Sequence, residues 1–157
     1  MLFRSYAVRS VAFAADGQVL ASASADKTVK LWDARTGAEL RTLRGHAGAG
    51  ATSVAFAADG QVLALANADN TVKLWDTRTG AELRTLPGHT GPVTSVVFSA
   101  DGQVLASASW DKTVKLWDAR TGQELRTLRG HTAQVTSVAF APDRQVLASA
   151  SWTRRSS

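Results

Sequence analysis

Short runs of alternating apolar and small or polar residues, separated by turn residues, recur along the whole chain. Val8–Phe13 (VRSVAF) is rich in valine and phenylalanine, and Val19–Ser24 (VLASAS) alternates larger with smaller side chains. Both patterns are typical of β-strands. The dipeptide Asp16-Gly17 lies between them and is a strong hairpin signal, because both residue types accept the backbone torsions of a tight turn. The pattern therefore predicts a β-hairpin at the start of the chain.

The same unit continues with two further strands. A tight turn at 25–27 leads into 28–32 (TVKLW), whose β-branched and aromatic residues favour a strand. A turn at 36–37 leads into Glu39–Leu43 (ELRTL), which is charged and suits an outer sheet edge, where charge discourages aggregation. Since no stretch keeps a helical period, we predict an all-β fold of four-stranded antiparallel units.

This unit repeats along the chain. The stretch 104–131 (VLASASWDKTVKLWDARTGQELRTLRGH) is almost unchanged at 19–46 and appears in weaker form at 62–89. Each copy carries a Trp-Asp pair at the same place and ends on a Gly-His pair: Trp32-Asp33, Trp75-Asp76 and Trp117-Asp118, then Gly45-His46, Gly88-His89 and Gly130-His131. Successive Trp-Asp pairs are 43 and then 42 residues apart. Such a period indicates a repeat architecture and has to be considered before any local motif.

With a Gly-His and a Trp-Asp pair in each unit of about 40–45 residues, the chain resembles the WD-repeat (Trp-Asp) β-propeller family. The resemblance covers nearly all of 8–152. It implies blades of four antiparallel strands, in which the first strand lines a central channel and the fourth lies outermost. The expected division is a lead-in at 1–7, blades at 8–45, 46–88 and 89–130, half of a fourth blade at 131–152, and a tail at 153–157.

Three units and two strands of a fourth do not close a ring, because propellers have about four to eight blades. The ends of the arc would expose Val11 and Phe13 on the first blade, and Val146 and Leu147 on the last. We therefore expect a homodimer in which two chains, joined head to tail, form an eight-bladed ring. A seven-bladed ring with a displaced half-blade and a four-bladed monomer are alternatives. The near-identity of the first and third units also fits a fragment of a longer repeat protein or an engineered chain.

Composition narrows the classes of function. A chain of 157 residues that is 45% hydrophobic and 20% charged is globular rather than disordered. The lack of cysteine excludes disulfides, thiolate metal sites and cysteine nucleophiles. The start of the chain has too short an apolar core for a signal peptide, and no apolar run reaches membrane-spanning length. We therefore expect a cytoplasmic protein that does not contact a membrane.

The net charge of +5 is distributed along the repeats, with basic residues spread one or two at a time. A nucleic-acid surface would instead cluster basic residues and interleave them with aromatic ones. The spread indicates a solvated rim, so a nucleic-acid partner is not expected.

Three polar residues of the third unit, His89, Ser107 and Asp111, are of the types that form a hydrolytic triad. The family resemblance implies another role for them. In the family, a structural hydrogen-bond chain links a Gly-His histidine, a turn aspartate, a second-strand serine and a third-strand tryptophan within each blade. Because a catalytic triad repeated around a ring is implausible, we expect this chain to stabilise the blade, and we expect no enzymatic activity.

This expected hydrogen-bond chain is complete in one blade only. The third blade has the whole set, His89, Ser107, Asp111 and Trp117, the first has Ser22, Asp26 and Trp32, and the second has His46, Asp69 and Trp75. Arg4 stands at the histidine position of the first blade, and Leu65 stands at the serine position of the second. Since the loss of a buried partner costs about 1–3 kcal/mol, we expect the terminal blades to be less stable.

Trp110 and Trp152 stand where the first two units have Ala25 and Ala68. In the family, this position precedes the turn aspartate on the surface that commonly contacts partners. Exposed tryptophan is also enriched at binding hot spots. We expect both indoles to bind a partner; packing flat against the next blade is the alternative role.

The remaining candidates for chemistry follow the repeat. The three histidines are too far apart for a metal site, and the glycines that follow threonine have the pattern of turns rather than of a phosphate-binding loop. We therefore expect no metal and no cofactor. The expected function is a non-catalytic scaffold that binds a protein partner. A lectin-like propeller that binds a ligand is the alternative, and would need repeated aromatic pockets between blades.

Overall fold

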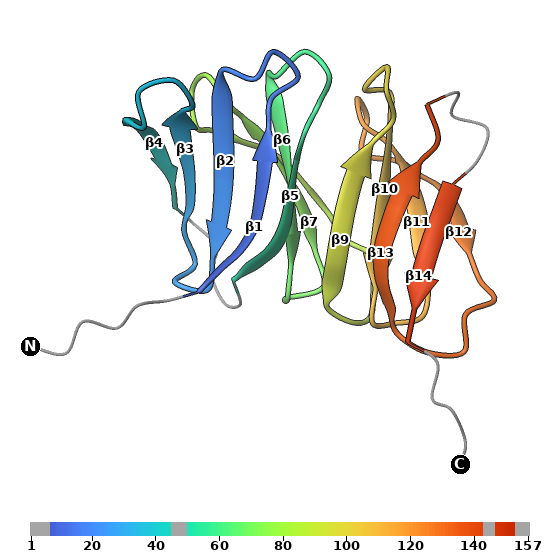
Figure 1. The fold of residues 1–157 in the computed structure, drawn as a ribbon. Helices are drawn as coiled ribbons and strands as arrows, with labels where there is room; N and C mark the ends of the chain where they lie inside the picture. The colour runs from blue at the N-terminus through green and yellow to red at the C-terminus, as the bar shows by residue number, and fades with distance from the viewer. Residues whose placement is uncertain (1–6, 45–49, 143–146, 153–157) are drawn as a thin grey trace, which may run out of the picture.

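The computed structural model describes residues 7–44, 50–142 and 147–152, and these contain β-strands and no helix (Figure 1). The strands form three four-stranded antiparallel sheets and one two-stranded sheet. The first sheet contains β1 (Val8–Phe13), β2 (Val19–Ser24), β3 (Val29–Asp33) and β4 (Glu39–Leu43). The second contains β5 (Ala51–Phe56), β6 (Val62–Asn67), β7 (Val72–Asp76) and β8 (Glu82–Leu86). The third contains β9 (Val93–Phe98), β10 (Val104–Ser109), β11 (Val114–Asp118) and β12 (Glu124–Leu128), and the last contains β13 (Val135–Phe140) and β14 (Leu147–Ser151).

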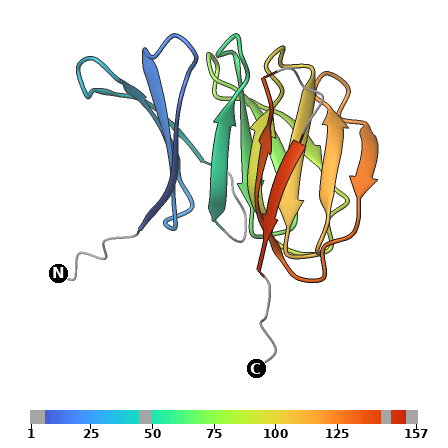
Figure 2. The ribbon, with the colours of Figure 1, turned by 45° about the vertical axis from the view of Figure 1, so that its right-hand side comes forward.

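Each sheet is one blade, and the blades follow one another in chain order (Figures 1 and 2). The first strands, β1, β5, β9 and β13, lie next to one another across the blade junctions. This arrangement is an open, incomplete propeller, so the predicted all-β propeller fold is confirmed. No helix in the described part of the chain is long and apolar enough to cross a membrane.

Turn chemistry decides where the third strand of a blade begins. The sequence predicts a strand at 28–32, whereas β3 is Val29–Asp33. Asp26 Oδ1 accepts hydrogen bonds from both the N–H (2.9 Å) and the hydroxyl (2.6 Å) of Thr28, so Thr28 belongs to the turn. Lys27 has a φ of 69° in this turn. An aspartate followed two residues later by a threonine therefore marks a turn rather than the start of a strand.

The apolar cores lie between neighbouring blades. One cluster joins the first and second blades, one joins the second and third, and one joins the third and fourth. A β-strand directs successive side chains to opposite sides, so alternate apolar residues of one strand lie on the two faces of its blade. A blade is therefore covered on both faces only where it has a neighbour on each side.

Hydrogen bonds between first strands also join the blades. The hydroxyl of Thr52 on β5 donates to Val93 O on β9, and that of Thr94 on β9 donates to Val135 O on β13 (2.7 Å). At the first junction, the Val54 N–H donates to Ser10 Oγ instead (3.3 Å). Each later junction thus has a threonine of one blade bonded to a main-chain carbonyl of the next.

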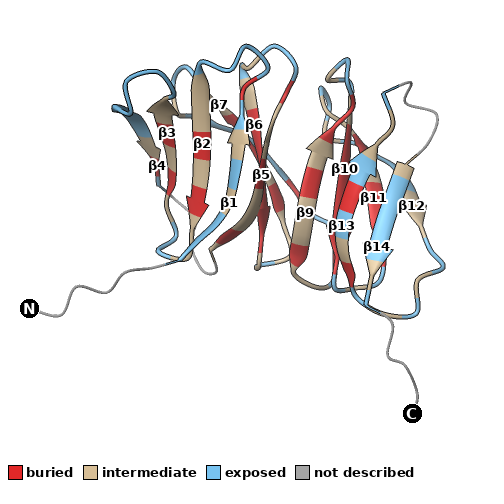
Figure 3. Cartoon of the chain, viewed as in Figure 1, coloured by how far each residue is buried: buried red, intermediate tan, exposed pale blue. Residues whose placement is uncertain are grey.

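The two ends of the arc are uncovered (Figure 3). Val11 and Phe13 on β1 are 59% and 62% exposed, whereas Val54 and Val96, at the position of Val11 in the next two blades, are 5% and 4% exposed. At the other end, the middle of β14 is exposed, although the same positions of β10 are fully buried. Leu147 is half-buried, and Val146 lies outside the described residues. Both ends therefore present surface that a neighbouring blade covers elsewhere in the molecule.

Candidate functional site

The third blade brings His89, Ser107, Asp111 and Trp117 together. Ser107 lies on β10 and Trp117 on β11, while Asp111 lies in the turn between these strands and His89 precedes β9. Trp117 Nε1 lies 2.9 Å from Ser107 Oγ, and that oxygen lies 2.7 Å from His89 Nε2. His89 Nδ1 lies 2.7 Å from Asp111 Oδ2. The four side chains thus form one continuous hydrogen-bonded chain.

The direction of these hydrogen bonds follows from their two ends. The Trp117 indole can only donate and the Asp111 carboxylate can only accept. His89 therefore carries its proton on Nδ1, and its Nε2 accepts the Ser107 hydroxyl. In this order, every polar hydrogen of the chain has one acceptor, and the histidine is neutral.

Threonines in the adjoining turns fix the aspartate at the end of this chain. Asp111 Oδ1 accepts from the Thr113 hydroxyl (2.6 Å) and N–H (2.9 Å), and Oδ2 accepts from the Thr90 N–H (3.2 Å). Ser107 is fully buried and His89 is 7% exposed. A substrate cannot reach the serine oxygen in this arrangement.

Burial and charge also decide the protonation of the pair. Burial lowers the pKa of His89 below its usual range, although the carboxylate of Asp111 opposes the shift. Burial raises the pKa of Asp111, but hydrogen bonds from Thr113 and His89 outweigh this effect and lower it overall. Both directions favour a neutral imidazole beside an ionised carboxylate at neutral pH.

We expect acid to destabilise the third blade. The unfolded chain protonates His89 near its ordinary pKa of about 6.5, while the folded chain resists protonation, so the unfolded state binds more protons as the pH falls. The stability contributed by neutral His89 is present above about pH 6.5 and is lost as the pH falls through the lower folded pKa. Thermal melts at pH 7.5 and pH 5.5 measure the loss. It should become smaller in His89→Gln and persist in the control His131→Gln; an equal loss in all three proteins would contradict the assignment.

The other blades assemble parts of the same chain. In the first blade, Trp32 Nε1 donates to Ser22 Oγ (2.9 Å), and Asp26 holds Thr28 in the turn. In the half-blade, His131 Nε2 lies 2.7 Å from Ser149 Oγ at an exposed position.

The second blade differs because it lacks the serine. Fully buried Leu65 takes the serine position and lies with Trp75 in one apolar cluster, and Asp69 accepts the Thr71 hydroxyl (2.6 Å). His46 lies outside the described residues, as do Arg4 and Thr153. Of the described residues, only those of the third blade therefore form the four-membered chain.

Sequence reasoning missed a second polar cluster in each of the three four-stranded blades. Lys115 on β11 donates to Glu124 Oε1 (2.6 Å) and Thr127 Oγ1 (2.8 Å) on β12, and only 7% of Lys115 is exposed. The Lys115 ammonium group and the Thr127 hydroxyl lower the pKa of Glu124. The same bonds join Lys30 to Glu39 and Lys73 to Glu82. Their recurrence at the repeat period was the signal that could have revealed them.

Trp110 and Trp152 lie at equivalent positions after the second strands of neighbouring blades. The Trp110 N–H donates to Pro92 O (3.0 Å), and the Trp152 N–H donates to Gln134 O (3.2 Å). Trp110 is 49% exposed and Trp152 is 71% exposed. Trp152 and Lys112 border a cavity of about 600 Å³ at this end of the strands. Two exposed indoles and a cationic side chain thus lie at one end of the third and fourth blades.

Four stretches of the chain, 3–33, 37–76, 80–118 and 122–155, match the WD40 family, described as WD domain, G-beta repeat. The chain is 61% identical over 36 residues to protein Mut11 of Chlamydomonas reinhardtii, which is 23% of this chain and 10% of that protein. It is 67% identical over 30 residues to nuclear distribution protein PAC1 of Arthroderma benhamiae, which is 19% of this chain and 6% of that protein.

Solved structures show the same fold. Those of U3-55K and of the RRP9 WD40 repeats each superpose with a TM-score of 0.82 at 23% sequence identity, covering 87% of this chain and 43% of the other. The chain therefore spans less than half the length of these structures, and its aligned segments span a tenth or less of the two relatives.

Proposed function

Because the chain belongs to the WD40-repeat family, we propose that it is a non-catalytic scaffold that binds a protein partner through the face carrying Trp110 and Trp152. The observation that supports this most directly is the exposure of both indoles at the same position of neighbouring blades. Tryptophan is enriched at interface hot spots, where a large ring buries much apolar area at little cost in conformational entropy. Lys112 beside the cavity adds a polar contact at the edge of this surface.

The polar residues of the third blade support a stabilising role for His89, Ser107 and Asp111. The serine oxygen already accepts from Trp117 and donates to His89, and it is fully buried. A nucleophilic serine must instead reach a substrate carbonyl. In our proposal, these side chains hold β10, β11 and the loop before β9 together.

A second copy of the chain is proposed to complete the ring. Val11 and Phe13 are exposed at the first end of the arc, although neighbouring blades cover the equivalent apolar positions elsewhere in the molecule. At the other end, Thr136 occupies the place of Thr52 and Thr94, which bond the carbonyl of the next blade. Two chains joined head to tail would cover both ends by one two-fold operation, and a closed two-fold assembly avoids open fibres.

Trp110→Ala is expected to remove the main anchor of the partner. A central tryptophan contributes at least about 2 kcal/mol, so the dissociation constant should rise about 30-fold or more. Proteins that the wild type retains in a pull-down are identified, and their affinities are then measured by calorimetry. Leu83→Ala is the matched control, because Leu83 is 51% exposed on β8, away from the indoles. Unchanged affinity in Trp110→Ala would assign the ring to packing against its blade.

A further inference from the structure

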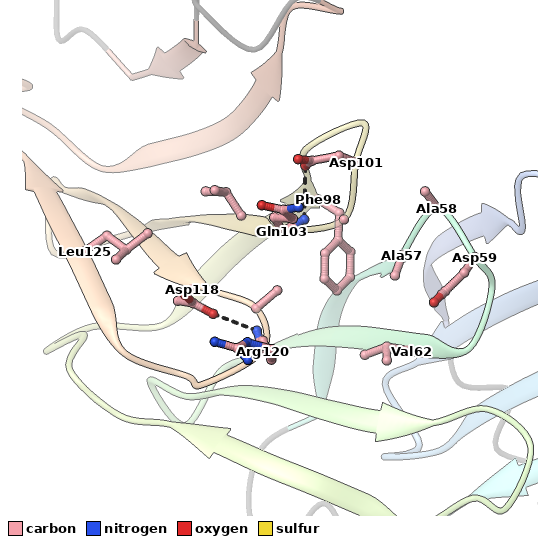
Figure 4. Close-up of a pocket in the computed structure, with 13 residues that line it drawn as sticks. Ala57, Ala58, Asp59, Val62, Phe98, Asp101, Gln103, Asp118, Arg120 and Leu125 are labelled. Carbon is pink, nitrogen blue, oxygen red and sulfur yellow. Dashed lines mark hydrogen bonds between the residues drawn. The ribbon is translucent and has the colours of Figure 1, made fainter.

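A groove opens between the second and third blades, on the face opposite the two tryptophans (Figure 4). It is bordered by the turn that joins β5 to β6 and by the turns that join β9 to β10 and β11 to β12. The tryptophans instead follow the other ends of β10 and β14. The groove has a volume of about 660 Å³, which lies in the range of sites that bind small ligands or short peptide segments.

The wall of the groove is apolar and its rim is acidic. Val62, Phe98 and Leu125 contribute apolar surface, and Leu125 is half exposed. Asp59, Asp101 and Asp118 lie at the rim together with the guanidinium of Arg120. Three carboxylates beside one cation make this groove acidic on a chain whose net charge is +5.

Two of the rim carboxylates have an oxygen available for a ligand. Asp59 Oδ1 accepts the Gln61 N–H (2.9 Å), and Asp118 Oδ1 accepts the N–H groups of Arg120 (2.9 Å) and Thr121 (3.0 Å). Within the described part of the chain, Oδ2 of Asp59 and Oδ2 of Asp118 accept no hydrogen bond. The turn N–H groups lower the pKa of Asp118, so this carboxylate is ionised at neutral pH.

Residue 119 differs from its equivalent in the second blade. Ala119 lines it, whereas Thr77 holds the equivalent position in the second blade and donates to Gly60 O (2.7 Å). The corresponding cavity beside Thr77, also bordered by Val19 and Phe56, measures only about 180 Å³. In the first blade, Ala34 stands at this position and lines a cavity of about 560 Å³ that only first-blade residues border. Alanine at this position thus accompanies the two larger cavities, and threonine accompanies the smallest.

From these observations we propose that the groove binds an extended segment of a partner protein in which a basic side chain adjoins a large apolar one. The basic group pairs with Asp59 and Asp118, and the apolar group packs against Phe98 and Leu125. Charge complementarity favours this partner over an acidic segment. A metal ion is a poor occupant, because no three carboxylate or imidazole groups of residues 7–44, 50–142 and 147–152 come together as a metal site. A partner bound here leaves the opposite face free for Trp110.

The test uses the whole chain and a fluorescein-labelled hexapeptide of alternating arginine and leucine, followed by fluorescence anisotropy. The wild type should bind this peptide, and a matched peptide with glutamate in place of arginine should not bind. Ala119→Thr should weaken binding at least about tenfold, because the added side chain fills the groove as Thr77 does in the second blade. Ala34→Thr makes the same change at the equivalent position of the first blade; it is the control and should retain wild-type affinity, because Ala34 does not line the groove. A melting curve establishes that Ala119→Thr is folded.

A second variant keeps the proposal testable if Ala119→Thr does not fold. Asp59→Asn retains an oxygen for the Gln61 N–H but removes the charge, so it should weaken binding about five- to tenfold and reduce its salt dependence. Three results would overturn the proposal: no binding by the wild type at millimolar peptide, equal binding of both peptides, or unchanged binding in the folded variants. A changed mass of Ala119→Thr without peptide would assign the groove to a second copy of the chain, and this too would overturn it.

Discussion

Ser107→Ala is expected to lower the free energy of unfolding by about 2–4 kcal/mol, and the melting temperature by about 4–15 °C. The hydroxyl of Ser107 serves two buried partners, since it accepts from Trp117 Nε1 and donates to His89 Nε2. Alanine leaves both groups buried and without that partner, and each orphaned group costs about 1–3 kcal/mol. Chemical denaturation and thermal melts measure the loss.

Ser22→Ala is the matched control for this prediction. Ser22 holds the same position in the first blade, but it is only half-buried and, among the described residues, accepts from Trp32 alone. The loss there should be about 1 kcal/mol. Equal losses in the two variants would contradict the role assigned to the chain through His89. A hydrolytic activity that disappears in Ser107→Ala without loss of stability would show that the serine is catalytic.

The second large effect concerns the ends of the arc. Light scattering after gel filtration is expected to give the mass of two chains for the wild type and of one chain for Val11→Glu. Val11 is 59% exposed on β1, and the proposed partner copy would cover it. An uncompensated charge buried there costs at least about 3 kcal/mol, which raises the dissociation constant about 100-fold or more.

Leu40→Glu is the control for the assembly. Leu40 is similarly exposed, at 54%, but it lies on outer strand β4 rather than on the first strand. This variant should retain the mass of two chains. A wild type that has the mass of one chain at micromolar concentration and melts cooperatively would contradict the dimer. Dissociation of both variants would show that the contact involves more than the end face.

The strands could be anticipated because they depend on short-range signals, whereas the polar chain of the third blade was expected only from the resemblance to the WD-repeat family. Alternation and turn residues place β1, β2 and β4, and the repeat places Ser107 one strand away from Trp117. The start of β3 was predicted one residue too early, because the side chain of Asp26 competes for the N–H of Thr28.

Contacts between blades could not be anticipated in the same way. The hydroxyls of Thr52 and Thr94 bond to main-chain carbonyl oxygens. Every residue type has such an oxygen, so the sequence does not indicate which one accepts. The importance of Ala119, where the second blade has Thr77, depends on how closely two neighbouring blades approach, which strand patterns do not report. Comparison of equivalent repeat positions could have shown that Ala119 and Thr77 differ, but not that a groove lies beside Ala119.

The threonine junctions have an evolutionary consequence. Because Thr52 and Thr94 bond only the main chain of the following blade, any repeat that joins the array can accept this bond, whatever its side chains. Duplication of the repeat therefore transmits a working junction without a compensating change in its neighbour. Such junctions do not limit the number of copies in a gene. The number of repeats at which a ring closes must instead depend on the angle between neighbouring blades. The apolar side chains packed between the blades determine that angle.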